Sequence, residues 1–134
     1  RKNGRERFMM PAPAFAELRL GPYVVKDPER VKSVPEDLAA ASASLEKLKA
    51  TPTILLSYQV MYQSAKALIH SSGYHIVNFR ALLSALQALY VKPGKLDASL
   101  VEALEKSQEV VLEPDHYAAQ AEQWLNRAKE LAKS

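Results

Sequence analysis

Hydrophobic residues recur at intervals of three and four in five successive stretches of the chain, which begin near residues 33, 51, 78, 97 and 115. This spacing places them on one face of an α-helix. The second stretch has the clearest pattern, and its apolar face includes Leu55, Met61 and Leu68. The alternation typical of β-strands is lacking except before residue 28. The pattern therefore predicts five helices.

Residues suited to helix ends lie at several of these boundaries. Thr51 followed by Pro52 has the arrangement of an N-cap and a proline in the first turn, so the second helix is expected to begin there. Asn78 and Asp97 are the expected N-caps of the third and fourth helices. Gly73 is the expected end of the second helix, because glycine readily adopts the left-handed conformation found there.

Together these elements predict an all-α fold, a compact antiparallel bundle of four to five helices with short connections. The bundle is expected to comprise residues 28–134. Four of the eight prolines precede residue 30, and proline disrupts a regular helix. Residues 1–27 are therefore expected to form a basic, extended arm. A short extended piece is expected at Tyr23–Val25, because tyrosine and valine favour strands.

Composition narrows the classes of function. The chain has 134 residues, enough for one domain with one core. It contains no cysteine, which excludes disulfides, thiolate metal ligands and cysteine nucleophiles. Residues 1–32 hold eight of the 18 Lys and Arg but only four of the 15 Asp and Glu. The net charge of +3 thus arises in a segment that is either a solvated arm or an RNA contact.

No apolar run approaches the roughly 18 residues that a membrane-spanning helix needs. The basic start of the chain is followed by "PAPAF" and not by the apolar core of a signal peptide. We therefore expect no membrane association and a cytoplasmic location.

The sequence "VVLEPDHYAAQ" places Asp115, His116 and Tyr117 next to each other at the start of the fifth helix. One interpretation is structural: Asp115 caps the helix and His116 is a residue of its first turn. In the catalytic interpretation His116 is a general acid or base aided by Asp115 or Tyr117, and Arg80 or Lys106 supplies a cation for a phosphate. Contact with a ligand without chemistry is a third interpretation. The sequence leaves all three open.

A polar stripe lies along the second helix, where Gln59, Gln63, Lys66 and His70 follow each other at steps of four, three and four. The stripe is either a solvated face or the wall of a groove that contacts a nucleotide or RNA.

A metal site is not expected, because His70 and His75 stand five apart across a glycine with no carboxylate between them. No phosphate-binding or dinucleotide-binding glycine motif is present, and no cofactor is expected.

Several segments resemble the HEPN-domain family. The segment "SYQVMYQSAKALIHSSGY" is similar to its second core helix, in which a tyrosine-rich stretch leads into A-(K/R)-A-L and a glycine. The matching positions are Tyr58, Met61, Tyr62, Ala65, Lys66, Ala67, Leu68 and Gly73. The segment "NFRALLSALQALYVKPGKLDASLVEAL" resembles the next family segment, "DHY" falls near an Asp-Tyr position, and "DPERVKSVPEDLAAASASLEKL" resembles the opening helix. The resemblance covers residues 28–134.

This resemblance implies a helical bundle of the nucleotidyltransferase substrate-binding-subunit type, usually dimeric. Many HEPN proteins are toxins or phage-defence ribonucleases paired with a nucleotidyltransferase antitoxin, and others are non-catalytic binding modules. The ribonucleases carry an arginine followed, after four to six intervening residues, by a histidine, which hold the phosphate and transfer protons respectively. No arginine precedes His70, His75 or His116 at that spacing, so the signature is missing.

Three functions are therefore considered. The first is a non-catalytic, dimerising HEPN-like domain that binds a nucleotidyltransferase-type partner, RNA or a nucleotide. The second is an active, metal-independent ribonuclease toxin of a toxin-antitoxin or defence system, with its site rearranged around His116. The third is a helical accessory domain unrelated to HEPN. A homodimer is expected because Tyr58, Met61, Tyr62 and Trp124 could leave apolar surface uncovered by a bundle this small.

Overall fold

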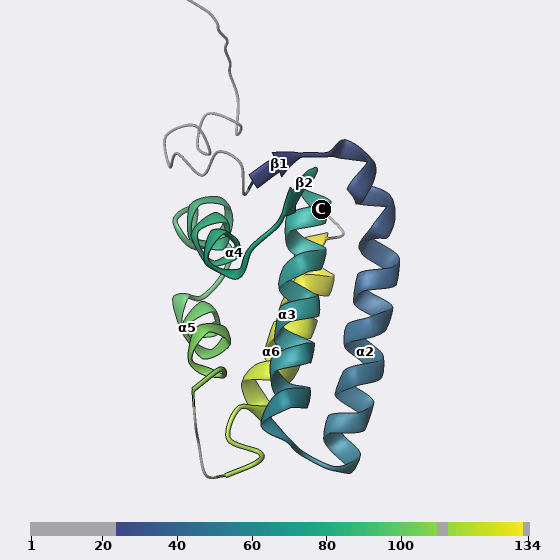
Figure 1. Ribbon diagram of the computed structural model, residues 1–134, viewed down its shortest axis with the longest axis vertical. Helices are drawn as coiled ribbons and strands as arrows, with labels where there is room; N and C mark the ends of the chain where they lie inside the picture. Colours follow the sequence, from purple (N-terminus) through teal and green to yellow (C-terminus); the bar gives the residue numbers. More distant parts are fainter. Residues whose placement is uncertain (1–23, 110–112, 133–134) are drawn as a thin grey trace, which may run out of the picture.

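Three long helices form the body of the protein (Figure 1). The computed structural model describes residues 24–109 and 113–132. In it α2 (Val34–Ala50), α3 (Ile54–Ser71) and α6 (Ala118–Ala132) lie side by side, with α3 in contact with both of the others. The described part of the chain is thus predominantly helical, with five α-helices, which confirms the predicted all-α class.

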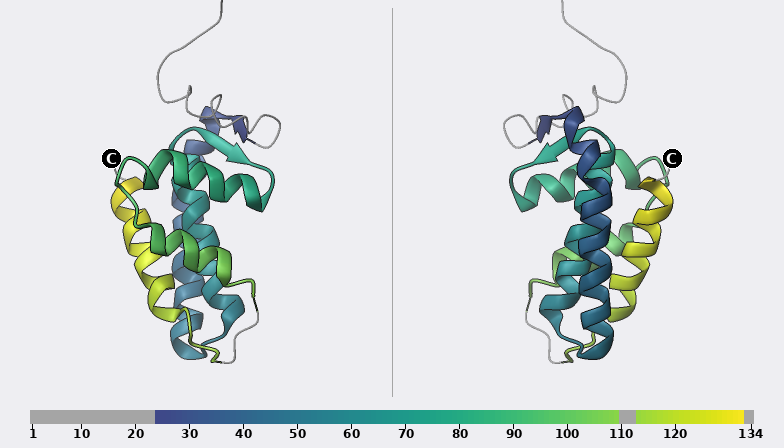
Figure 2. Two further views of the ribbon diagram at one scale, coloured as in Figure 1. Left: turned by 90° about the vertical axis from the view of Figure 1, so that its left-hand side faces the viewer. Right: turned by 90° about the vertical axis from the view of Figure 1, so that its right-hand side faces the viewer.

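The other two α-helices do not extend the bundle but cross it. Figure 2 shows α4 (Phe79–Leu86) and α5 (Ala98–Lys106) lying across the long helices at a steep angle. Together they lead the chain from the end of α3 back to the opposite end of the bundle (Figure 1). As a result α6 runs in the same direction as α3, while α2 runs antiparallel to both. The wholly antiparallel arrangement expected from the short connections is therefore wrong for α6.

A two-stranded antiparallel sheet closes one end of the molecule. It pairs β1 (Val24–Lys26) with β2 (Tyr74–Ile76), and Val25 lies opposite His75. The extended conformation of Val24 and Val25 was expected, whereas β2 was not, because three residues are too few to show a strand periodicity. A short 3₁₀ helix, η2 (Pro28–Ser33), joins β1 to α2. Of the expected arm, residues 1–23 lie outside the described part of the chain.

Side-chain caps define where three helices begin. The side chain of Asn78 accepts a hydrogen bond from the backbone of Ala81 at 2.7 Å, and Asp97 caps α5 in the same way. Both caps were expected. The expected cap at Thr51 is wrong: Thr51 ends α2, and Thr53 caps α3 by accepting a hydrogen bond from the backbone N–H of Leu56 at 3.0 Å.

One turn of π-helix, η3 (Gln87–Val91), follows α4. Its wider winding is marked by the hydrogen bond from the Lys92 backbone N–H to the Gln87 carbonyl, five residues back. The turn carries the buried Tyr90, whose hydroxyl donates to the Leu68 carbonyl of α3 at 2.8 Å. The π turn therefore anchors the crossing helices on the carboxyl-terminal part of α3.

The core contains large apolar side chains from all three long helices, among them Leu48, Leu68 and Leu125. Met61 and Trp124 are fully buried, and the indole N–H of Trp124 donates to the Leu100 carbonyl at 2.7 Å. These two side chains therefore do not provide the free apolar surface that was expected for a partner. Among the described residues Leu55, 63% exposed, is the large hydrophobic residue with the greatest exposure.

None of the helices in residues 24–109 and 113–132 combines the length and the hydropathy that a membrane span requires.

Candidate functional site

Two histidines meet where α3 ends and β2 begins. His70 occupies the last turn of α3, and the chain reverses at Gly73, whose φ of +83° is a left-handed conformation suited to glycine. The Gly73 carbonyl accepts a hydrogen bond from the backbone N–H of Asp27 at 2.8 Å, which joins the turn to the segment after β1. The reversal brings His75 of β2 back beside His70.

Asp37, His70 and His75 form a chain of polar contacts. The Nδ1 atom of His70 lies 2.6 Å from a carboxylate oxygen of Asp37 on α2. Its Nε2 atom lies 3.4 Å from Nδ1 of His75, and the two rings stack with their centroids 5.6 Å apart. The His70 and Asp37 side chains are only 4% and 13% exposed, so both ring nitrogens of His70 are engaged within the protein.

The surroundings of His75 are mainly positive. Burial lowers the pKa of His75 from its ordinary value of 6.5, and the charges of Arg30, His70 and Lys66 lower it further. Asp27 acts in the opposite direction but more weakly than Arg30. In the ligand-free protein His75 is therefore neutral at pH 7.

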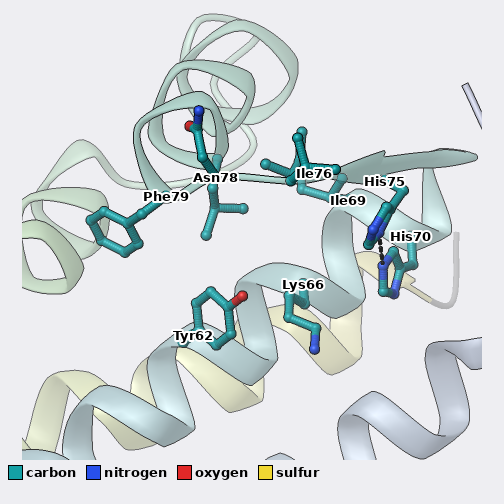
Figure 3. A pocket seen from close by; sticks show the side chains of 10 residues that line it. Tyr62, Lys66, Ile69, His70, His75, Ile76, Asn78 and Phe79 are labelled. Atoms are coloured by element: carbon teal, nitrogen blue, oxygen red, sulfur yellow. Dashed lines mark hydrogen bonds between the residues drawn. The ribbon is translucent and has the colours of Figure 1, made fainter. Parts of the chain in front are cut away.

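A pocket of about 290 Å³ opens beside this histidine pair. Its walls are α3 on one side and the segment from β2 to the start of α4 on the other (Figure 3). The residues that line it are Tyr62, Lys66, Ile69, His70, His75, Ile76, Val77, Asn78, Phe79 and Leu82. The two histidines lie at one end in Figure 3, and the rings of Tyr62 and Phe79 lie at the other. One end of the pocket is thus polar and the other aromatic.

Lys66 lies between these two ends. Its ammonium group is 5.4 Å from the centroid of the Tyr62 ring, close enough for a cation–π contact. Tyr62 also stacks on Tyr58 with 5.6 Å between ring centroids, and Tyr58 in turn contacts Phe79 at 6.2 Å. Burial, and then the neighbouring Tyr62, raise the pKa of Tyr58, so the Tyr58 ring stays uncharged at neutral pH.

The structure divides the polar stripe of α3. Lys66 and His70 line the pocket. Gln63 instead faces α2, where its side-chain amide lies 2.9 Å from the hydroxyl of Ser44. Gln63 therefore joins two helices and does not line the pocket.

The residues expected around the fifth helix lie elsewhere. Asp115 and His116 are exposed in the turn before α6, whereas Tyr117 is buried and meets the His116 ring edge-on at 4.6 Å. Lys106 ends α5 and pairs with Glu102 at 3.0 Å. The turn before α6 lies at the end of the bundle opposite to β2 (Figure 1).

Arg80 is exposed near the start of α4 and is not among the residues that line the pocket. The structure thus does not bring Arg80, Lys106, Asp115 and Tyr117 together with Lys66 and His70.

Asp37 is the site residue that sequence reasoning missed. It lies 33 positions before His70 in the sequence, and nothing in the spacing of its own helix distinguishes it from the other carboxylates there. His75 was considered only as a metal ligand and as the histidine of the ribonuclease signature. In the described part of the chain no group of three His, Asp or Glu side chains is arranged to hold a metal ion. Arg30 and Lys66 also make the surroundings of His75 unfavourable for a cation.

Comparisons with protein-family models, curated proteins and solved structures found no match to this chain.

Proposed function

We propose that the chain is a non-catalytic binding domain of the HEPN type, which its sequence resembles, and that its pocket holds the phosphate and base of a nucleotide or an RNA end. The observation that carries this proposal is the division of the pocket. His75 offers a hydrogen-bonding nitrogen at one end, and Tyr62 and Phe79 offer aromatic faces at the other. Lys66 offers positive charge between them.

Each part of this arrangement matches one part of a nucleotide. A lysine binds phosphate as a point charge, and aromatic side chains stack on bases of any sequence. The volume of about 290 Å³ is at the lower end of ligand pockets. A pocket of this size suits a single nucleotide better than a duplex, so an RNA ligand would enter it with one unpaired nucleotide.

The second expected function, a ribonuclease with its site around His116, has less support. His116 is exposed, and Lys106, the nearest expected cation in the sequence, is paired with Glu102. The arginine of the family signature is also missing before this histidine. Cleavage of RNA at low protein concentration that disappears in His116→Ala would contradict the proposal.

Homodimerisation and association with a nucleotidyltransferase-type protein are further parts of the proposal. The support is a hollow of about 420 Å³ lined by Ile54, Leu55, Tyr58 and residues 107–109. Leu55 projects there with most of its surface exposed. This hollow is separate from the pocket beside the histidines, so a partner and a nucleotide could bind together.

The nucleotide proposal is tested by titrating AMP and adenosine into ¹⁵N-labelled protein and following the amide signals of residues 62–79. We expect AMP to shift these signals with at least tenfold higher affinity than adenosine, because only AMP has a phosphate for Lys66. Lys66→Gln should weaken AMP binding about tenfold. The control is Lys47→Gln, which removes an exposed lysine of α2. Equal affinity for AMP and adenosine, or an equal effect of both variants, would contradict the proposal.

A further inference from the structure

The chain of contacts from Asp37 through His70 to His75 determines which groups the pocket can bind. We infer that Asp37 and His70 are positioning residues that make the outer nitrogen of His75, Nε2, a hydrogen-bond donor only when the histidine pair gains a proton. An anionic ligand and one proton would then bind together. This inference rests on the proposed function of the pocket and adds the way in which binding is regulated.

The first step concerns Asp37 and His70. An ionised carboxylate only accepts hydrogen bonds, and its oxygen lies 2.6 Å from Nδ1 of His70. The hydrogen in this contact is therefore on Nδ1. A neutral imidazole carries one hydrogen, so Nε2 of a neutral His70 has a lone pair and accepts.

The second step concerns the contact between the two rings. Nε2 of His70 and Nδ1 of His75 are 3.4 Å apart, a long hydrogen bond that requires one hydrogen between them. When His70 is neutral, His75 must supply that hydrogen from Nδ1. A neutral His75 then has none on Nε2, so the nitrogen left for a ligand is an acceptor.

A ligand oxygen with negative charge needs a donor at this position. Nε2 of His75 can donate only if the pair holds one more hydrogen, whichever of the two rings becomes an imidazolium. This conclusion follows from counting hydrogens along the chain, and it does not depend on how the added charge is divided between the rings. A ligand that donates a hydrogen bond to Nε2 would bind without the extra proton.

The charges around His75 decide when that proton enters. Arg30 from η2 and Lys66 from α3 oppose a charge on His75, while Asp27, before η2, favours it. The carboxylate of Asp37 lies on the far side of His70. Burial and the nearby cations lower the pKa of His75, which opposes uptake of the proton by this ring in the ligand-free protein. A bound anion offsets Arg30 and Lys66 and thereby allows the proton to enter.

Replacing the Asp37 carboxylate by an amide should reverse the direction of the hydrogen bonds from residue 37 through His70 to His75. In Asp37→Asn the amide N–H₂ can donate to Nδ1 of His70. His70 then carries its hydrogen on Nε2 and donates to His75, which in turn carries its hydrogen on its own Nε2. The variant can therefore bind an anion without taking up a proton. This prediction would not arise if Asp37 only supported the fold.

The test uses sulfate as the probe, because its charge stays constant across the pH range, and isothermal titration at pH 6 to 8.5. We expect the affinity of the unmodified protein to fall about tenfold per pH unit above the midpoint of the pair's titration, as one linked proton requires. In Asp37→Asn the affinity should change less than twofold over the same range. Glu46→Gln, which neutralises an exposed carboxylate on the same helix, should behave as the unmodified protein.

Equal pH dependence in the unmodified protein and Asp37→Asn would overturn the inference and leave the pocket intact as a binding site. Binding of neither sulfate nor AMP at any pH would overturn the proposed function. In that case the inference is tested separately, by ¹⁵N spectra of the histidine rings in the free protein at neutral pH. His75 should carry its hydrogen on Nδ1 in the unmodified protein and on Nε2 in Asp37→Asn. Any other distribution would overturn the inference.

Discussion

The contact between Asp37 and His70 should contribute measurably to the stability of the fold. An exposed ion pair stabilises by at most about 1 kcal/mol, but these two side chains are 13% and 4% exposed. At 2.6 Å the contact is a short, charge-assisted hydrogen bond, for which about 1.5–3 kcal/mol is typical. Asp37→Ala also leaves Nδ1 of His70 without an acceptor inside the protein. We therefore expect this variant to lose about 2–4 kcal/mol of unfolding free energy.

Asp37→Asn should lose less, about 1–2 kcal/mol, because a neutral hydrogen bond worth about 1 kcal/mol remains. A domain of this kind has roughly 5–15 kcal/mol of stability, so both variants should remain folded at 25 °C. The measurement is urea unfolding at pH 7 followed by helix circular dichroism. Glu46→Ala, at an exposed position of the same helix, should change the free energy by less than about 0.5 kcal/mol.

A double-mutant cycle separates the hydrogen bond from the packing of the two side chains. Asp37→Ala, His70→Ala and the double variant should give a coupling energy of about 1.5–3 kcal/mol. If each single variant loses unfolding free energy but the coupling energy is under about 0.5 kcal/mol, the loss comes from packing alone and not from the hydrogen bond. The assignment of Asp37 as the residue that positions His70 would then be refuted.

Four other predictions concern the fold and its surface. Thr53→Ala should cost about 1 kcal/mol, as loss of an N-cap does, whereas Thr51→Ala should cost less than about 0.5 kcal/mol. Trp124→Phe should cost about 2–4 kcal/mol, because it removes a buried indole hydrogen bond and leaves a cavity; a smaller loss in urea unfolding would contradict this. His75 has a lowered pKa in the folded protein, so the unfolded chain binds more protons below about pH 6.5. Stability should therefore fall as the pH falls through that range, and less so in His75→Gln. Leu55→Glu should convert the proposed homodimer to a monomer in light scattering, and an unchanged dimer mass would exclude this face as the interface.

Much of the fold could be predicted because its signals are local. The caps at Asn78 and Asp97 precede a helical pattern directly, and the end of α3 has a glycine that supplies the required backbone conformation. The error at Thr51 has a physical reason. The sequence "TPT" offers two caps, and α2 extends far enough for the backbone of Thr51 to bond to the Lys47 carbonyl. Only Thr53 is then left to cap α3.

The site could be predicted only in part, because some of its contacts join residues that are distant in the sequence and leave no local signal. Lys66 and His70 share one helix, so their spacing revealed them. Asp37 meets His70 only because α2 and α3 pack at a particular rotation about their axes, which one sequence does not specify. Asp115 and His116 were candidates because they are adjacent to Tyr117, but neighbours in a turn point in different directions. Two of the three are exposed and Tyr117 is buried.

The pairing of β1 with β2 also affects the order in which the molecule assembles. The ladder joins residue 24 to residue 76 across η2 and two complete α-helices. Contacts so distant in sequence form late, because the intervening chain must be ordered first. The hairpin of α2 and α3 needs no such closure. His75 should therefore reach its place after the long helices have formed, and it should leave before they melt. As the denaturant concentration rises, binding of the proposed ligand should be lost while the helical circular dichroism is still complete. The denaturation midpoint for binding should therefore lie below that for the helical structure.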